Sequence, residues 1–123
     1  MYENILVIDD SETSRMIIKK CFTMTGFETS HFFEAEDGIR ALTVLAEHRV
    51  DLVVTDLNMP RMDGLTLVKK LKMGDRTSAI PVFVISSMGN ETLEQELTRL
   101  GVKHIIRKPL TPAKISGIVE GGF

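Results

Sequence analysis

The fold is decided by the stretch Val50-Asp51-Leu52-Val53-Val54-Thr55-Asp56-Leu57-Asn58-Met59-Pro60-Arg61-Met62-Asp63-Gly64. Its first half is an apolar run that is too short for a helix and is typical of a buried parallel strand. The run stops at a carboxylate, and the Asn, Pro and Gly that follow it indicate a loop. Ligands of open α/β sheets bind at the carboxyl ends of the strands, so Asp56 is a candidate functional residue.

Four other short apolar runs are spread along the chain, and a helical pattern follows each of them. They predict strands at residues 4–8, 28–33, 81–85 and 103–107, in addition to the strand that ends at Asp56. The first helix is expected at residues 12–25, and the last is expected to end near residue 119. Predicted N-caps are Ser11, Asn90 and Thr111, and predicted helix terminators are Gly26, Gly74 and Gly101.

The helical patterns also predict which side chains face the sheet, because apolar residues recur there at helical spacing. The expected inward-facing residues are, in chain order, Ile17, Ile18, Cys21, Phe22, Ile39, Leu42, Leu45, Ala46, Leu65, Val68, Leu71, Leu93, Leu97 and Leu100.

Strands and helices alternate five times without internal repeats or linkers, which indicates the α/β class with a parallel sheet and helices on both faces. Right-handed crossovers bring the carboxyl ends of all strands to one edge. Polar residues stand at or just after four of these ends and should converge. They are Asp9, Asp10, Asp56, Ser86 and Lys108.

Length and composition narrow the possible functions. The 123 residues fit a single domain, and a net charge of −2 argues against direct nucleic-acid binding. No apolar run approaches the roughly 18 residues that a membrane span needs. Cys21 is the single cysteine, which excludes an internal disulfide and fits a cytoplasmic protein. His31, His48 and His104 lack the spacing of metal ligands.

The polar cluster suggests phosphoryl chemistry. Two carboxylates about 4 Å apart repel by roughly 4 kcal/mol at an effective dielectric of 20, so three of them need a cation. Mg²⁺, which prefers oxygen ligands, suits Asp10 and Asp56. With Lys108 nearby, Asp56 could attack a phosphorus atom and form an acyl phosphate. Ser86 would then hydrogen-bond the arriving phosphoryl group, which would make the site a switch.

Each of these residues alone has an ordinary explanation. A single Asp at a strand end is usually a helix cap or a turn residue, and Lys108 before a proline could be a surface charge. Their joint occurrence at successive strand ends is what favours a functional site.

The chain resembles the receiver domains of two-component response regulators, most closely the single-domain chemotaxis type, over nearly its whole length. The matching segments are Val7-Ile8-Asp9-Asp10, Glu34-Ala35-Glu36-Asp37-Gly38, Asp56-Leu57-Asn58-Met59-Pro60-Arg61-Met62-Asp63-Gly64, Ile80-Pro81-Val82-Phe83-Val84-Ile85-Ser86 and Lys108-Pro109-Leu110. The resemblance implies a flavodoxin-like, doubly wound sheet of five parallel strands in the order 2-1-3-4-5, with five helices.

The resemblance also implies roles for the site residues. Asp56 would accept the phosphoryl group of a histidine kinase or phosphotransfer protein. Asp10, Asp56 and the backbone carbonyl of Asn58 would hold Mg²⁺, with Asp9 assisting through water. Lys108 would pair with the phosphate and precede a cis proline, and Ser86 would be the hydroxyl that moves on phosphorylation.

Two positions depart from the family pattern. Ile105 stands where a Tyr or Phe is usual in the last strand, and Ser87 where Ala is common. We therefore expect Ile105 to stay packed, and residues 86–90 to carry the signal to an output protein that binds the face of the fourth helix, last strand and last helix. Met88 is expected to influence the lifetime of the phosphate.

The protein is thus predicted to catalyse only its own phosphorylation and dephosphorylation, as a monomer or a weak phosphorylation-dependent dimer. Two alternatives remain: an interaction module that works without phosphorylation, and an aspartyl-phosphate phosphatase. The phosphatase would need a general acid two residues beyond Asp56, where Asn58 stands. The chain could be a native single domain or a piece of a longer regulator.

Overall fold

The computed structural model describes residues 2–27, 30–87 and 91–120, within which strands and helices alternate along the chain. The elements are β1 (Asn4–Ile8), α1 (Glu12–Thr23), β2 (His31–Ala35), α2 (Gly38–Glu47), β3 (Leu52–Asp56), α3 (Gly64–Met73), β4 (Val82–Ser86), α4 (Glu91–Arg99), β5 (His104–Arg107) and α5 (Pro112–Glu120). No helix in these ranges is both long and apolar enough to cross a membrane.

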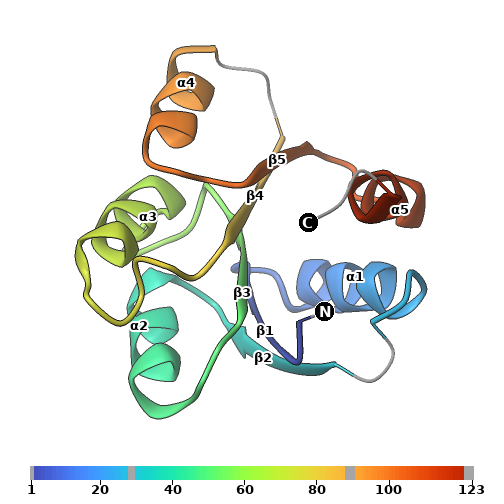
Figure 1. The fold of residues 1–123 in the computed structure, drawn as a ribbon, viewed down its shortest axis with the longest axis horizontal. Coiled ribbons are helices and arrows are strands. Elements are labelled where there is room, and N and C mark those ends of the chain that lie inside the picture. The colour runs from blue at the N-terminus through green and yellow to red at the C-terminus, as the bar shows by residue number, and fades with distance from the viewer. Residues whose placement is uncertain (1, 28–29, 88–90, 121–123) are drawn as a thin grey trace.

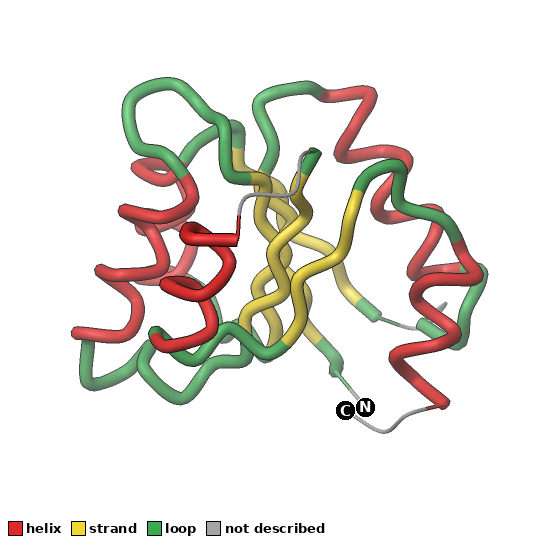
Figure 2. Tube along the Cα trace, turned by 90° about the horizontal axis from the view of Figure 1, so that it is seen from above, coloured by secondary structure: helices red, strands yellow, loops and turns green. Residues whose placement is uncertain are grey.

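The strands form one parallel sheet in the order β2-β1-β3-β4-β5, which confirms the predicted fold class and strand order. Helices α1 and α5 cover one face of the sheet, and α2, α3 and α4 cover the other (Figure 1). Viewed from above, the strands lie between two layers of helices (Figure 2). All strands point the same way, so their carboxyl ends share one edge.

Alternate side chains of the inner strands supply the cores on the two faces. In β1, Leu6 and Ile8 pack toward α2 and α3, whereas Ile5 and Val7 pack toward α1 and α5. All residues of β3 and β4 are buried, as expected for inner strands of a sheet that is covered on both sides. The loops at the carboxyl edge therefore start from strands that are buried on both faces.

Several helix caps agree with the sequence analysis. The Ser11 side chain accepts a hydrogen bond from the Ser14 N–H at 3.2 Å, and Thr111 Oγ1 accepts one from the Lys114 N–H at 3.3 Å. Gly101 has a φ of 93°, a value that favours glycine at the end of a helix. The predicted cap at Asn90 lies outside the described residues.

Some expected boundaries and faces were wrong. Strand β2 runs to Ala35, further than expected, and α1 ends at Thr23, before the predicted residue 25. Ile17 and Ile39 are about half exposed and Ala46 is exposed, although all three were expected to face inward. The buried face of α2 is instead formed by Gly38, Ala41, Val44 and Leu45. Apolar residues at the borders of a helix face therefore remain in contact with solvent.

Candidate functional site

Three carboxylates meet at the carboxyl edge of the sheet. Asp9 and Asp10 follow β1 and Asp56 ends β3, and one oxygen from each lies within 4.8 Å of the others. Asp9 and Asp56 are buried, whereas Asp10 is exposed. The predicted convergence of these three residues is confirmed.

Asp56 is fixed through both carboxylate oxygens. Oδ1 accepts a hydrogen bond from the Leu57 N–H at 2.8 Å, and Oδ2 lies 3.3 Å from Lys108 Nζ. The backbone N–H of Lys108 donates to the Ser86 carbonyl at 2.8 Å, and the Lys108–Pro109 peptide is cis, as the resemblance implied. The strand ends of β3, β4 and β5 thus position one ion pair.

Asp9 is anchored to the start of α1. Its Oδ1 accepts a hydrogen bond from the Ser11 N–H at 2.9 Å, and its Oδ2 accepts one from the Ser14 hydroxyl at 2.7 Å. The positive end of the helix dipole also favours a carboxylate at this place. Asp9 therefore has both oxygens engaged by the protein, and its indirect role at the metal site stays a prediction.

The remaining predicted site residues lie at the same edge. Ser86 ends β4, is buried, and follows Ile85, the register partner of Asp56. Asn58 is exposed in the loop two residues beyond Asp56, and Ser87 is exposed after β4. Met88 lies outside the described residues. The individual roles of Ser86 and Asn58 stay predictions.

Gly64 shapes the loop that follows β3. Its N–H donates to the Leu57 carbonyl at 2.8 Å, and a Cβ on this residue would lie only 2.3 Å from the Asp56 carbonyl oxygen. Only glycine allows this close approach, so the chain can turn back at Gly64 and start α3 beside Asp56. Gly64 was predicted to belong to a loop, but its close contact with the Asp56 carbonyl was not predicted.

Asp37 and Arg61 were also missed as structural partners. Asp37 caps α2 by accepting a hydrogen bond from the Arg40 N–H at 2.8 Å, and its second oxygen accepts one from Arg61 Nε at 2.7 Å. The cap could have been found from sequence, because Asp stands directly before an apolar helical pattern. The pair with Arg61 could not, because it joins two loops that are distant in sequence.

The donor set fits a divalent cation. Three negative charges and one positive charge leave the cluster of Asp9, Asp10, Asp56 and Lys108 with an excess of two negative charges. Carboxylate oxygens are the ligands that Mg²⁺ prefers, and the exposed Asp10 lets an ion approach from solvent. Asp10 and Asp56 are the side chains that would hold such an ion.

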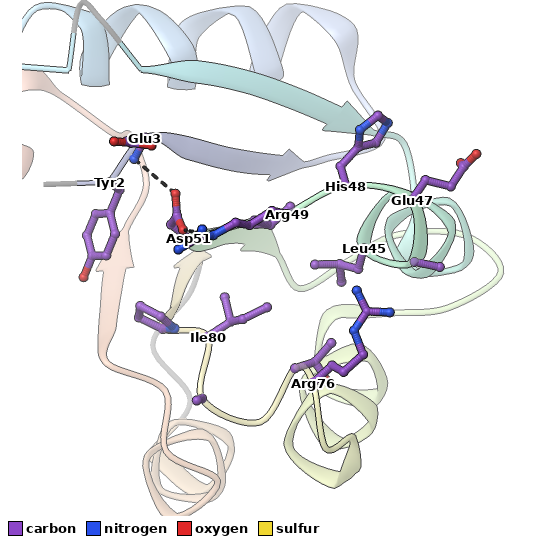
Figure 3. Close-up of a pocket in the computed structure, with 14 residues that line it drawn as sticks. Tyr2, Glu3, Leu45, Glu47, His48, Arg49, Asp51, Arg76 and Ile80 are labelled. Atoms are coloured by element: carbon purple, nitrogen blue, oxygen red, sulfur yellow. Dashed lines mark hydrogen bonds and ion pairs between the residues drawn. The ribbon is translucent and has the colours of Figure 1, made fainter.

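A separate cavity of about 970 Å³ lies near the amino ends of β1 and β3, at the opposite edge of the sheet (Figure 3). Its lining includes Glu3, Asp51, Arg76 and Ile80. Asp51 accepts hydrogen bonds there from the backbone N–H groups of Glu3 and Asn4. The carboxylate cluster is not part of this cavity.

This combination of a doubly wound parallel sheet and an acidic edge defines a receiver-type domain. Residues 5–120 match the model of the response regulator receiver domain, and the chain belongs to this family. The match covers the five strands except for Asn4, the first residue of β1, and it includes Asp9, Asp10, Asp56 and Lys108.

Within the family, the chain is similar to proteins named for chemotaxis. It is 39% identical to chemotaxis protein CheY1 of Helicobacter pylori strain J99 over 117 residues, which cover 94% of this chain and 93% of that protein. It is 36% identical to chemotaxis protein CheY of Bacillus subtilis, covering 94% and 92% of the two chains. A solved structure of Vibrio cholerae CheY4 covers both chains fully with a TM-score of 0.85 at 24% identity, which supports the fold.

Proposed function

We propose that this protein is a phosphorylation-dependent signalling switch whose phosphoryl acceptor is Asp56. The donor would be the phosphohistidine of a sensor histidine kinase or phosphotransfer protein, and the reaction would require Mg²⁺. The observation that carries the proposal is the ion pair of 3.3 Å between Asp56 Oδ2 and Lys108 Nζ beside two further carboxylates. Membership in the receiver family supports it.

In the proposed reaction, a carboxylate oxygen of Asp56 forms a bond to phosphorus while the bond from phosphorus to the donor imidazole nitrogen breaks. The departing nitrogen keeps the bonding electron pair. The Leu57 N–H holds one carboxylate oxygen in place, which limits rotation of the nucleophile. Bound Mg²⁺ would supply neutralisation of charge on the phosphoryl oxygens.

Lys108 has a second task in this scheme. Before the reaction its ammonium group offsets the charge of Asp56, and afterwards it can pair with an oxygen of the new phosphoryl group. Ser86, which ends the neighbouring strand β4, would donate its hydroxyl hydrogen to another phosphoryl oxygen. This hydrogen bond would move the Ser86 side chain, and the movement would change the conformation at the end of β4 and in the loop after it.

The output surface would be the face formed by α4, β5 and α5. A groove of about 600 Å³ there is lined by Glu91, Glu94, Gln95, Thr98, Arg99 and Ile105. Ile105 is partly buried and packs against the core, and Arg107 of β5 pairs with Glu94 of α4 at 3.3 Å. The names of the relatives make a chemotaxis partner the first one to test.

The proposal also includes the expected location, binding properties and oligomeric state of the protein. The protein would act in the cytoplasm without binding nucleic acid, turn over no external substrate, and be a monomer or a weak dimer after phosphorylation. An interaction module independent of phosphorylation is the second candidate. The cluster of mutually repelling carboxylates favours the switch, because a module without chemistry gains nothing from that repulsion.

Beryllofluoride, a phosphoryl mimic, tests the switch. With Mg²⁺ present, we expect it to shift amide resonances near Asp56, Ser86 and Lys108 in the wild-type protein, and to leave those of Asp56→Asn unchanged. Equal shifts in both proteins would show that the mimic does not bind at Asp56. No shift in either protein, with Mg²⁺ bound, would favour the module.

A further inference from the structure

The β3–α3 loop, residues 57–63, is tied to the start of α2 by side chains that the proposed reaction does not use. Arg61 Nε donates to Asp37 Oδ2 at 2.7 Å, and the terminal NH2 group of Arg61 contacts the same oxygen. The Asp37 side chain is only 1% exposed, and its other oxygen caps α2 through the Arg40 N–H. One buried carboxylate therefore joins a helix start to the loop that carries Asn58.

The backbone of the loop needs such support. Arg61 has a φ of 65°, in the left-handed region that side chains make unfavourable. The Met62 N–H donates to the Pro60 carbonyl at 2.7 Å, so residues 60–62 form a tight γ-turn centred on Arg61. A strained turn of this kind persists only where its surroundings hold it, and the contact with Asp37 does so here.

A second contact brings the same two segments together. The Gly38 N–H donates to the Met62 carbonyl at 3.3 Å, and a Cβ on Gly38 would lie 2.8 Å from Met62 Cγ. The Arg40 N–H lowers the pKa of Asp37 below its ordinary value, and the Arg61 side chain adds to this shift, although burial opposes it. Asp37 is therefore ionised at neutral pH, where the pair with Arg61 is retained.

We propose that Arg61 and Asp37 are positioning residues for the phosphoryl site, because their pair fixes the β3–α3 loop beside Asp56. The inference rests on the proposed function, since the loop supplies the Asn58 carbonyl that is expected to complete the Mg²⁺ site. Mg²⁺ demands nearly ideal octahedral geometry, so the affinity of the site for Mg²⁺ falls if the position of the carbonyl oxygen varies. Groups that orient metal ligands typically change metal affinity 10- to 100-fold when removed.

The test compares Arg61→Gly with wild type in two measurements. Glycine tolerates a φ of 65°, so the variant should fold, but its melting temperature should fall because the buried Asp37 carboxylate loses its partner. We expect Mg²⁺ affinity, measured by calorimetric titration, to fall about tenfold. We also expect amide hydrogen exchange at residues 57–63 to become faster in the protein without metal.

Three further variants distinguish a positioning role of the Arg61–Asp37 pair from the effect of removing a positive charge. Arg76→Gly removes the same charge in the turn near the opposite edge of the sheet and should change neither measurement (Figure 3). Arg61→Lys keeps a cation and should restore part of the affinity. Asp37→Asn keeps a cap oxygen but weakens the pair, and its effect should not add to that of Arg61→Gly if the two residues act together.

Unchanged exchange and unchanged Mg²⁺ affinity in Arg61→Gly would overturn the proposal, as would fully additive effects of Arg61→Gly and Asp37→Asn. If the wild-type protein binds no Mg²⁺, the proposed function fails instead. The exchange comparison, which uses no metal, then still decides whether the pair holds the loop.

Discussion

Asp10 is the exposed member of the carboxylate cluster, and its removal should have opposite effects with and without metal. In Asp10→Ala we expect weaker Mg²⁺ binding, because an oxygen ligand is lost. Without metal, relief of repulsion should raise the free energy of unfolding by up to about 1 kcal/mol, the scale for exposed charges. Mg²⁺ titration measures the change in metal affinity, and urea unfolding without metal measures the change in stability. Normal Mg²⁺ binding, or lower stability without metal, would contradict the assignment.

The surroundings of His104 should make the free energy of unfolding depend on pH. Burial, followed by the charge of Lys103, lowers the pKa of His104 in the folded state, and its Nε2 is buried without a partner among the described residues. The unfolded chain then binds more protons than the folded one below about pH 6.5, the ordinary pKa of histidine. This contribution to stability is present above that pH and is lost as the pH falls through it.

The variant His104→Phe removes the titrating group and keeps an aromatic ring against Phe83, whose centroid lies 5.0 Å away. Urea unfolding between about pH 7 and pH 5 should therefore show a smaller loss of stability in the variant than in the wild-type protein. The same slope in both proteins would mean that His104 does not contribute.

Single residues show what the sequence could reveal about the site. Asp9, Asp10, Asp56 and Lys108 were found because each stands beside the end of an apolar run, and parallel strands bring such ends together. The pair of Asp37 with Arg61 was missed, because no local pattern says which of several charged loop residues will meet.

Gly64 sets the junction between β3 and α3 at the scale of elements. A Cβ there would lie 2.3 Å from the Asp56 carbonyl oxygen, so Gly64→Ala should lower the free energy of unfolding by about 3 kcal/mol, the upper range for overpacking. Gly117→Ala in α5 is a matched control with open space around its Cβ. It should raise stability by about 0.5–1 kcal/mol, because alanine favours the helix. Urea unfolding measures the change in the free energy of unfolding of each variant. A Gly64→Ala variant as stable as the wild-type protein would contradict the close approach.

Strand β5 should transmit the signal without a moving aromatic ring. Ile105 is branched at Cβ, stiff at χ1, and partly buried against the core, so we expect its rotamer to stay fixed when beryllofluoride binds. Methyl resonances report this, with the buried Ile106 on the same strand as an internal reference. An Ile105 methyl group that moves from solvent into the core would contradict the expectation. Residues 86–90 are expected to carry the change, and of these, residues 88–90 lie outside the described part of the chain.

Elements with strong periodicity were predicted best. Strand β1 was placed at its observed bounds, Asn4–Ile8, because a continuous β-branched run allows few alternatives. Strand β2 is an edge strand with both exposed and buried residues, and its predicted bounds of 28–33 differ from the observed ones by three residues at the start and two at the end, the usual error for boundaries. Helix faces were right at their centres, as at Ile18 and Leu97, and wrong at their borders, as at Ile39.

At the scale of the whole molecule, alternation of strands and helices predicts a parallel sheet, but not the order of its strands. Periodicity is a local property, and order depends on which face each crossover helix covers. The order β2-β1-β3-β4-β5 was available only through the resemblance to receiver domains. That order places β1 and β3 side by side, and this adjacency lets Asp9 and Asp10 meet Asp56.

The central claim is that Asp56 receives a phosphoryl group in a reaction that needs a divalent metal. The most direct measurement is intact mass after incubation with acetyl phosphate, with Mg²⁺ or with a chelator. Wild-type protein should gain the mass of one phosphoryl group with Mg²⁺ and none with the chelator, and Asp56→Asn, at equal stability, should gain none. Labelling of Asp56→Asn at the wild-type rate, or equal labelling of the wild type without metal, would contradict the account.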